Sequence, residues 1–212
     1  MKWITFLVNC NIKYYIYKLY KEDSIIIENN NHNAKTLVIL CGSTYLIKYF
    51  ANAEFLPIAI LSKDNIFNII TSSSNQKFYY KLTAIEKTYI IAFPQCALNK
   101  KQKSHVNFLE NIVKSYYKTL KKYEIMNEII NQKYLKNRTI QLLLSILLEF
   151  GIVKQNNIHI PFKVSNKNLA IMTGTNKTTI SKIMKEIYKN LNIKYSSKKI
   201  MNIKNIFNIK FY

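Results

Sequence analysis

The 212-residue chain is poor in the two residues that punctuate regular structure, with three glycines and three prolines. Average usage would give about fifteen glycines and ten prolines. This scarcity argues against a glycine-rich phosphate-binding loop. Acidic residues are also few: 11 against 32 lysines and arginines, for a net charge of +21. Such an imbalance predicts a polyanionic partner, either nucleic acid or an anionic membrane surface. Codon bias explains part of the lysine excess, because Lys, Asn, Ile and Tyr all have A/T-rich codons.

Cysteines and histidines are scarce as well, with three of each. Cys10, Cys41 and Cys96 are odd in number and widely spaced, so they form neither a zinc pattern nor a disulfide framework. The histidines show no spacing typical of a metal site or a catalytic triad. We therefore expect no metal, no catalytic residues and no enzyme activity.

Long apolar runs are missing too, since no window approaches the roughly 18 apolar residues of a membrane-spanning helix. The first eight residues resemble a signal peptide, but Asn9, Asn11 and Lys13 break the run and no cleavage site follows. We expect neither a leader nor a membrane partner. Residues 1–24 give no further prediction.

Short segments rich in Ile, Tyr, Phe, Val and Thr occupy residues 25–93, with turn-forming residues between them. Their near-regular spacing predicts a small antiparallel barrel or roll. The expected strands are 25–27, 36–40, 44–50, 55–61, 66–70, 78–84 and 88–93.

A long helix is expected over 104–136, where neither glycine nor proline occurs. At 1.5 Å per residue it would be about 45 Å long. Its apolar residues form a heptad-like series, which favours pairing with a second copy. The alternative is an amphipathic helix that lies on the barrel. The series comprises Leu109, Ile112, Tyr116, Tyr123, Met126 and Ile130.

A second helix over 139–150, with Ile140, Leu143, Leu144, Leu147 and Leu148 on its apolar face, is expected to end at Gly151 in a left-handed cap. A short strand over 158–162 should follow.

Residues 165–187 have the spacing of a helix-turn-helix. Ser165 is expected to cap a first helix over about 166–173, and small Ala170 allows the helices to cross closely. Gly174 can take the positive φ that the corner needs. Thr175 or Asn176 then caps the second helix.

The second helix is expected to bury Ile180, Ile183 and Ile187 and to present its opposite side to the DNA major groove. A solvated lysine face is the alternative. A hairpin over 193–195 and 200–203 reads as a wing whose basic tip meets phosphates. The candidate DNA-binding residues are Ser165, Thr175, Asn176, Lys177, Thr178, Thr179, Ser181, Lys182, Lys185, Lys198 and Lys199.

This order of elements resembles the cyclic-AMP receptor/FNR (CRP/FNR) family of transcription regulators, and within it the NtcA-type global nitrogen regulators of cyanobacteria and red-algal plastids. The resemblance is densest over 138–203, where it covers Arg138, Glu149-Phe150-Gly151, the helix-turn-helix and the wing. The family's DNA-reading arginines fall on Lys177 and Lys182, and lysine lacks their rigid bidentate fork.

The resemblance implies an α+β chain with a cyclic-nucleotide-binding-like β-roll (1–103), a dimerisation helix (104–136) and a winged helix-turn-helix (137–212). It implies a homodimeric, nitrogen-related regulator that binds palindromic double-stranded DNA and meets RNA polymerase. The expected location is the plastid stroma, or otherwise the cytoplasm of an A+T-rich bacterium.

The effector is also an inference from the resemblance. Cyclic AMP is not expected, since the Gly, Glu and Arg that grip its phosphate are absent, and the scattered cysteines disfavour an FNR-type iron–sulfur cluster. The global nitrogen regulators bind 2-oxoglutarate, but their second arginine falls near Thr119 here. The candidate effector-binding residues are Phe67, Asn68, Ile69, Ile70, Lys77 and Glu124.

Three other readings stay open. The chain could coat nucleic acid without sequence preference, through charge and stacking. It could be a replication initiator with a winged helix. It could also be a regulator that needs no effector.

Overall fold

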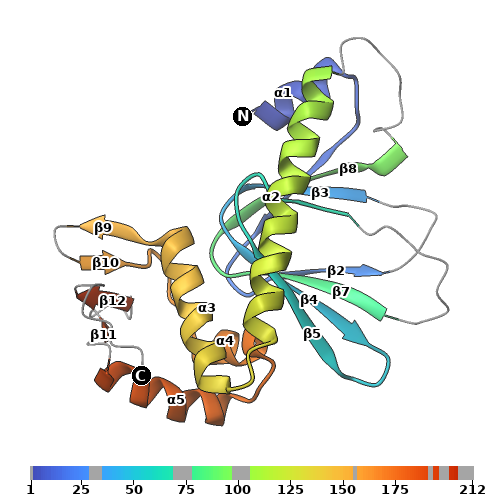
Figure 1. Ribbon diagram of the computed structural model, residues 1–212. Helices are drawn as coiled ribbons and strands as arrows, with labels where there is room; N and C mark the ends of the chain where they lie inside the picture. The colour runs from blue at the N-terminus through green and yellow to red at the C-terminus, as the bar shows by residue number, and fades with distance from the viewer. Residues whose placement is uncertain are drawn as a thin grey trace. The chain divides into compact units, whose positions relative to one another are not determined.

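The computed structural model (Figure 1) describes residues 2–28, 35–68, 78–96, 106–154, 157–190, 193–195 and 201–204. The chain divides into two compact units, Met1–Glu124 and Ile125–Tyr212. The elements that begin in the first unit are α1 (Lys2–Asn9), β1 (Tyr15–Leu19), β2 (Ser24–Glu28), β3 (Lys35–Cys41), β4 (Thr44–Phe50), β5 (Phe55–Leu61), β6 (Ile66–Phe67), β7 (Phe78–Ala84), β8 (Thr88–Pro94) and α2 (Val106–Ile130).

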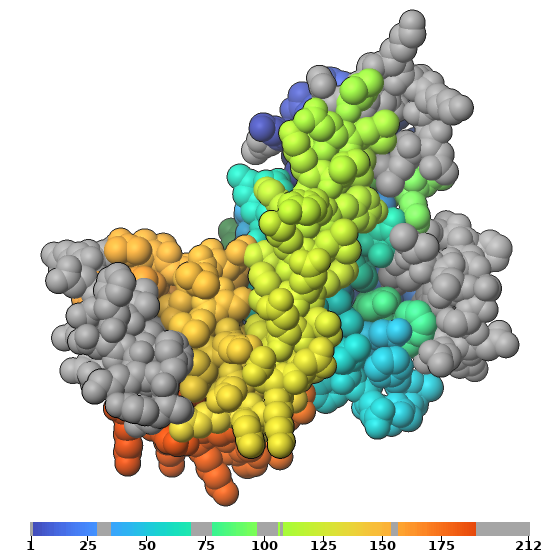
Figure 2. Space-filling model, viewed as in Figure 1, coloured from blue at the N-terminus to red at the C-terminus, as the bar shows by residue number. Residues whose placement is uncertain are grey.

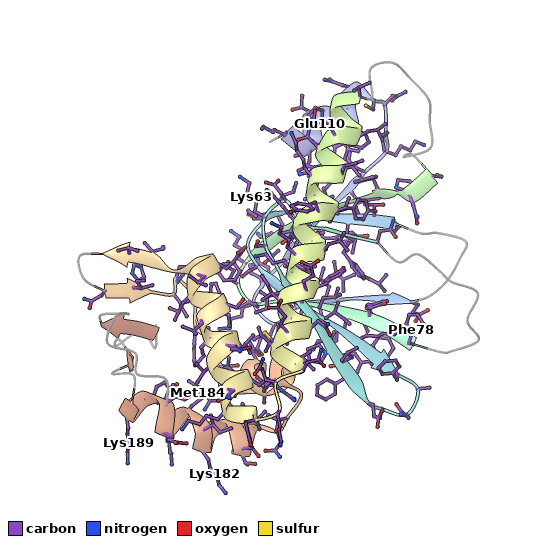
Figure 3. All side chains as sticks on the ribbon, in the orientation of Figure 1. Lys63, Phe78, Glu110, Lys182, Met184 and Lys189 are labelled. Carbon is purple, nitrogen blue, oxygen red and sulfur yellow. The ribbon has the colours of Figure 1, made fainter. Side chains whose placement is uncertain are left out.

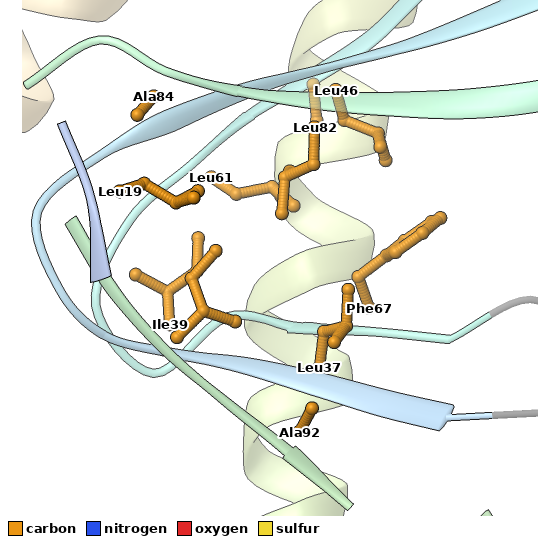
Figure 4. Close-up of a cluster of buried hydrophobic side chains, with 11 residues drawn as sticks. Leu19, Leu37, Ile39, Leu46, Leu61, Phe67, Leu82, Ala84 and Ala92 are labelled. Atoms are coloured by element: carbon orange, nitrogen blue, oxygen red, sulfur yellow. The ribbon is translucent and has the colours of Figure 1, made fainter. Parts of the chain in front are cut away.

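Two antiparallel sheets form most of the first unit, with strand orders β1-β8-β3-β6 and β2-β7-β4-β5. The strands predicted over 44–50, 55–61 and 78–84 are confirmed at both ends. Side chains alternate across each strand, so one face of each sheet contributes to an inner core. This core (Figure 4) contains Leu19, Leu37, Ile39, Leu46, Ala59, Leu61, Phe67, Leu82, Ala84, Ile90 and Ala92.

A second core lies on the outer face of the β1-β8-β3-β6 sheet. Strand β8 supplies Ile90 and Ala92 to the inner core and the alternate residues Ile91 and Phe93 to this outer one, so both of its faces are buried. Helix α1 and the start of α2 cover the outer face. The outer core contains Trp3, Leu7, Cys10, Ile12, Val38, Ile66, Ile91, Phe93, Phe108 and Ile112.

The N-terminal residues that the sequence left unassigned therefore have a packing role. Helix α1 buries Trp3 and Leu7, and the Trp3 ring meets Phe108 of α2 edge-on at 6.4 Å between centroids. The Trp3 indole N–H donates to the Asp64 carboxylate at 3.1 Å. The apolar run that resembles a signal peptide is thus one face of an amphipathic helix.

Helix α2 differs from its prediction in length and in facing. It spans Val106–Ile130 rather than 104–136. Ile112 and Tyr116 pack in the outer core and Tyr123 against the inner one, so this part of the predicted heptad series covers the sheets. For these residues the reading of a helix lying on the barrel is right.

After the end of α2, the second unit contains α3 (Leu135–Phe150), α4 (Asn166–Thr173), α5 (Lys177–Asn190) and a sheet with the order β11-β12-β10-β9. The strand predicted over 158–162 is present but begins one residue earlier and ends at His159, where it forms part of a hairpin. Its strands are β9 (Ile152–Lys154) and β10 (Asn157–His159), and β10 pairs with β12 (Met201–Lys204), which pairs with β11 (Ile193–Tyr195).

Two predictions for α3 are corrected. Leu148 is 88% exposed, whereas Leu142 and Ile146 are buried, because the buried stripe lies one step round the helix. Gly151 has φ −67° and ψ 129°, so the left-handed cap is wrong. A side chain at Gly151 would instead collide with the Leu147 carbonyl oxygen and meet Ile158 Cγ2 at 2.7 Å. Glycine is therefore required at position 151 because a Cβ atom does not fit between Leu147 and Ile158.

Candidate nucleic-acid interface

Helix α4 begins and ends as its sequence predicts. Ser165 has extended backbone, and its hydroxyl oxygen accepts the Asn168 backbone N–H at 3.1 Å, which satisfies one free donor of the first turn. Gly174 ends the helix in the left-handed region, with φ 69° and ψ 37°. That conformation costs a residue with a Cβ about 1–2 kcal/mol, so glycine suits this tight corner.

Helix α5 is capped by Asn176, which settles the choice left open between Thr175 and Asn176. Asn176 Oδ1 accepts the Thr179 backbone N–H at 2.8 Å. The hydroxyls of Thr178 and Thr179 also donate to this oxygen, at 2.6 and 2.8 Å. The first turn of α5 is therefore fixed by one side chain.

One side of α5 packs inside the second unit. Ile180, Met184 and Ile187 are at most 1% exposed, whereas Ile183 is only half-buried. The predicted stripe through Ile183 is therefore corrected to one through Met184, because steps of four and three keep residues on one face. The facing residues of α4 that are buried include Leu169, Ala170 and Met172.

The opposite side of α5 carries the cations. Lys177, Lys182, Lys185 and Lys189 are exposed, and none of them is ion-paired within the residues the structure describes. Figure 3 shows Lys182 and Lys189 projecting away from α3, with Met184 on the opposite side of the helix. We call these four residues the α5 lysine row.

Ser181 lies beside the α5 lysine row but is tied to α4. The Asn166 amide donates to Ser181 Oγ at 3.0 Å, and Ser181 Oγ donates to the Lys177 carbonyl oxygen at 2.8 Å. Lys136 of α3 adds a further tie by pairing with Glu186 at 2.6 Å. These contacts hold α5 at a set angle to α3 and α4.

Arg138 is a residue whose role sequence reasoning missed, although the resemblance includes it. Its Nη1 donates to the Thr173 carbonyl oxygen at 3.0 Å, at the end of α4. Its Nη2 donates to the Gln132 carbonyl oxygen at 3.1 Å, just after α2 ends. One guanidinium thus satisfies two free carbonyls and fixes the corner between α4 and α5. No local sequence pattern signals this contact.

The candidate effector residues are only partly brought together. Phe67 is buried in the inner core with its ring edge-on to Tyr80, and Asn68 donates to the Tyr116 hydroxyl at 3.0 Å. Glu124 is exposed. The remaining candidates, Ile69, Ile70 and Lys77, lie outside the described residues, as do Lys198 and Lys199 of the expected wing tip.

Two polar groups beside the inner core were not predicted, the Tyr123 phenol and the Lys48 ammonium. Burial, and then the neighbouring Tyr80 and Tyr116 hydroxyls, raise the pKa of the Tyr123 phenol far above its usual value. The Lys48 ammonium lies 3.9 Å from the Phe78 ring centroid. Lys48 stands two residues from the core residue Leu46 along β4, which is the signal that could have placed it on the inner face.

Two kinds of feature are absent from the residues that the structure describes. Among them, no helix is both long and apolar enough to cross a membrane. Nor do any three histidines, cysteines or acidic residues in those ranges gather in a way that could hold a metal ion.

Named relatives resemble the chain over most of its length, although no family model matches it. A protein of Porphyra purpurea named as an HTH-type transcriptional regulator, ycf28, is 26% identical over 199 residues, which cover 94% of this chain and 82% of the relative. The global nitrogen regulator of Synechocystis sp. is 20% identical over 164 residues, covering 76% of this chain and 73% of that protein. The resemblance to the global nitrogen regulators is thus confirmed.

Solved structures share the fold. A cyclic nucleotide-binding domain containing protein from Listeria monocytogenes has a TM-score of 0.73 at 15% identity, covering 96% of this chain and 98% of that one. A CRP/FNR-family transcriptional regulator from Thermus thermophilus has a TM-score of 0.64 at 14% identity, covering 92% and 96%. The chain therefore has a β-sheet core like that of the CRP/FNR fold.

Proposed function

We propose that this protein is a sequence-specific DNA-binding transcription regulator of the CRP/FNR type, in which residues 137–212 form a winged helix-turn-helix. The observation that carries the proposal is the arrangement of α4, Gly174 and α5, which buries one side of α5 and leaves the α5 lysine row exposed. The major groove of duplex DNA admits one α-helix, whose N-terminal residues reach base edges. The regulator names of the relatives support the same function.

The lysines have two separate tasks in this proposal. Lys177 and Lys182, in the first half of α5, donate to guanine O6 and N7. Lys185 meets phosphates, as would Lys198 and Lys199 of the wing, and phosphate contacts give salt-dependent affinity rather than specificity. The remaining candidates border the DNA-binding surface and stabilise it; they are Ser165, Thr175, Asn176, Thr179 and Ser181.

We also propose that the protein acts as a homodimer through α2. An apolar stripe along this helix is 43–69% exposed, and it consists of Val106, Leu109, Val113, Tyr117 and Leu120. Its steps of three and four residues are those of a helix pair. In the space-filling view one long side of α2 is uncovered (Figure 2). In this proposal a β-roll over 1–103 and the dimerisation helix α2 (Val106–Ile130) precede the DNA-binding domain.

The physiological setting is a proposal drawn from the relatives. The name of the Synechocystis relative supports a role in nitrogen regulation. The family resemblance adds 2-oxoglutarate as the proposed effector and RNA polymerase as the proposed partner. The red-algal relative supports a plastid location. A titration with 2-oxoglutarate, repeated on Lys77→Ala and Glu124→Ala, tests the effector. Binding heat from the unmutated protein but from neither variant supports Lys77 and Glu124 as effector-binding residues. A flat trace from the unmutated protein favours an effector-independent regulator.

A palindrome tests the main proposal. Duplexes enriched by the protein from a randomised library should share two inverted half-sites about one helical turn apart. In gel shifts at moderate salt, the protein should prefer this palindrome over a scrambled duplex in the presence of excess bulk polyanion. Equal binding to both duplexes would support the coating protein, which the +21 net charge also favours.

A further inference from the structure

The hydroxyl groups on the exposed side of α5 bear on which base the helix reads. Thr178 is exposed, and Thr179 and Ser181 are half-buried beside the α5 lysine row. A free hydroxyl at a base edge can both donate and accept, so by itself it discriminates poorly between bases. What each hydroxyl can offer depends on where its hydrogen is used.

Asn176 fixes the hydrogens of both threonines. The Thr179 backbone N–H donates to the Oδ1 atom of Asn176 at 2.8 Å, so that atom is the amide oxygen, which can only accept. The hydroxyls of Thr178 and Thr179 lie 2.6 and 2.8 Å from the same oxygen. Both hydroxyls must therefore donate to Asn176, and neither has a hydrogen left for a base.

Ser181 is committed in the same way. Its Oγ lies 2.8 Å from the carbonyl oxygen of Lys177, which can only accept, so the Ser181 hydrogen points into the helix backbone. The Asn166 amide occupies an acceptor position of the same hydroxyl. Within residues 177–185, the side-chain donors that remain are the ammonium groups of Lys177, Lys182 and Lys185.

We propose, on the basis of the DNA-binding function proposed above, that Thr178 recognises a thymine through methyl–methyl contact. With its hydroxyl turned to Asn176, Thr178 offers a base edge its γ-methyl group and an acceptor lone pair. Thymine is the base that presents an apolar group, the C5-methyl, in the major groove. Each half-site then contains a thymine read by Thr178 near guanines read by Lys177 and Lys182.

Uracil substitution isolates the methyl group. The duplex that the unmutated protein enriches from a randomised library is resynthesised with deoxyuridine at one thymine in each half-site, taking each thymine position in turn. Deoxyuridine lacks only the C5-methyl. Burying one methyl-sized group corresponds to roughly fourfold in affinity. Each substituted duplex lacks two methyl groups, one in each half-site. The duplex substituted at the thymine that Thr178 reads should therefore bind about tenfold or more weakly, as measured by fluorescence anisotropy.

Matched variants assign the effect to Thr178. Thr178→Ser keeps the hydroxyl for Asn176 but loses the methyl, and should bind the thymine and uracil duplexes equally. Thr178→Val keeps a methyl and should stay sensitive to uracil, as should Ser181→Ala. The proposal is overturned if no uracil position weakens the unmutated protein, or if Thr178→Ser keeps full sensitivity. A library that enriches no sequence overturns the proposed function itself, and this inference with it.

Discussion

At the scale of single residues, the partners of a side chain decide its role more than its type does. Ser181 and Lys182 are neighbours, but the serine hydroxyl bonds twice within the protein while the lysine ammonium is exposed. Sequence reasoning gave both the same role. The difference depends on Asn166, which lies on another helix and leaves no trace in the local pattern.

Replacing Lys182 tests the reading surface. Lys182→Ala should lower affinity for the enriched palindrome by about 1–3 kcal/mol per contact and relax the preference at one base. Lys63→Ala, an exposed lysine of the first unit, is the charge-matched control and should change affinity little. Equal losses in anisotropy titrations of the two variants would mean that bulk charge alone drives binding.

The buried phenol of Tyr123 predicts alkaline sensitivity. Because burial raises its pKa in the folded state, stability is fully present below the unfolded value of about 10 and is lost as pH rises beyond it. Urea unfolding at pH 8 and pH 11 should show a smaller drop for Tyr123→Phe than for the unmutated protein. Tyr20→Phe serves as control, since Lys18 lowers the pKa of this exposed tyrosine. An unchanged drop in Tyr123→Phe would contradict the account.

At the scale of elements, the termini of the helices are set by a few hydrogen bonds. Ser165, Gly174 and Asn176 follow capping rules that act over three or four residues, so the limits of α4 were predictable. Gly151 was not, because its reason is the close approach of Ile158 on a strand, which involves tertiary packing. The same holds for α2, where Ile112, Tyr116 and Tyr123 of the predicted heptad series pack on the sheets.

Removing the α5 cap should cost stability. Asn176→Ala should lower the free energy of unfolding by about 1 kcal/mol, since the Thr179 N–H and two hydroxyls lose their acceptor. Thr175→Ala, one residue earlier, should be nearly neutral. Urea titrations followed by circular dichroism measure both. A larger cost at Thr175 would place the cap there instead.

At the scale of the whole molecule, strand alternation and helix periodicity were enough to predict most strands of the first unit and the helices that follow, but not β1 (Tyr15–Leu19). Helix α1 was not predicted, because its apolar residues resemble a signal peptide. Their packing partner, Phe108, lies 105 residues after Trp3 in the sequence. The exposed stripe on α2 could not be identified from the sequence either, because it depends on which side of the helix packs against the sheets.

That stripe predicts the oligomeric state. Leu120→Lys should shift the protein from dimer to monomer in sedimentation velocity, because it places a charge within the apolar stripe, at its C-terminal end. Ile26→Lys changes an equally exposed apolar residue of β2, 59% exposed against 55%, and should leave the dimer intact. A dimer that survives Leu120→Lys would exclude this face as the interface.

The spacing of the half-sites tests the central claim most directly, because it requires both a groove-reading α5 and a two-fold pair. Five base pairs, about half a helical turn, are inserted between the half-sites of the enriched palindrome, and affinity is measured at fixed salt. We predict that binding falls to the level of a scrambled duplex, since the second α5 then faces the wrong side of the helix. Unchanged affinity would contradict the account.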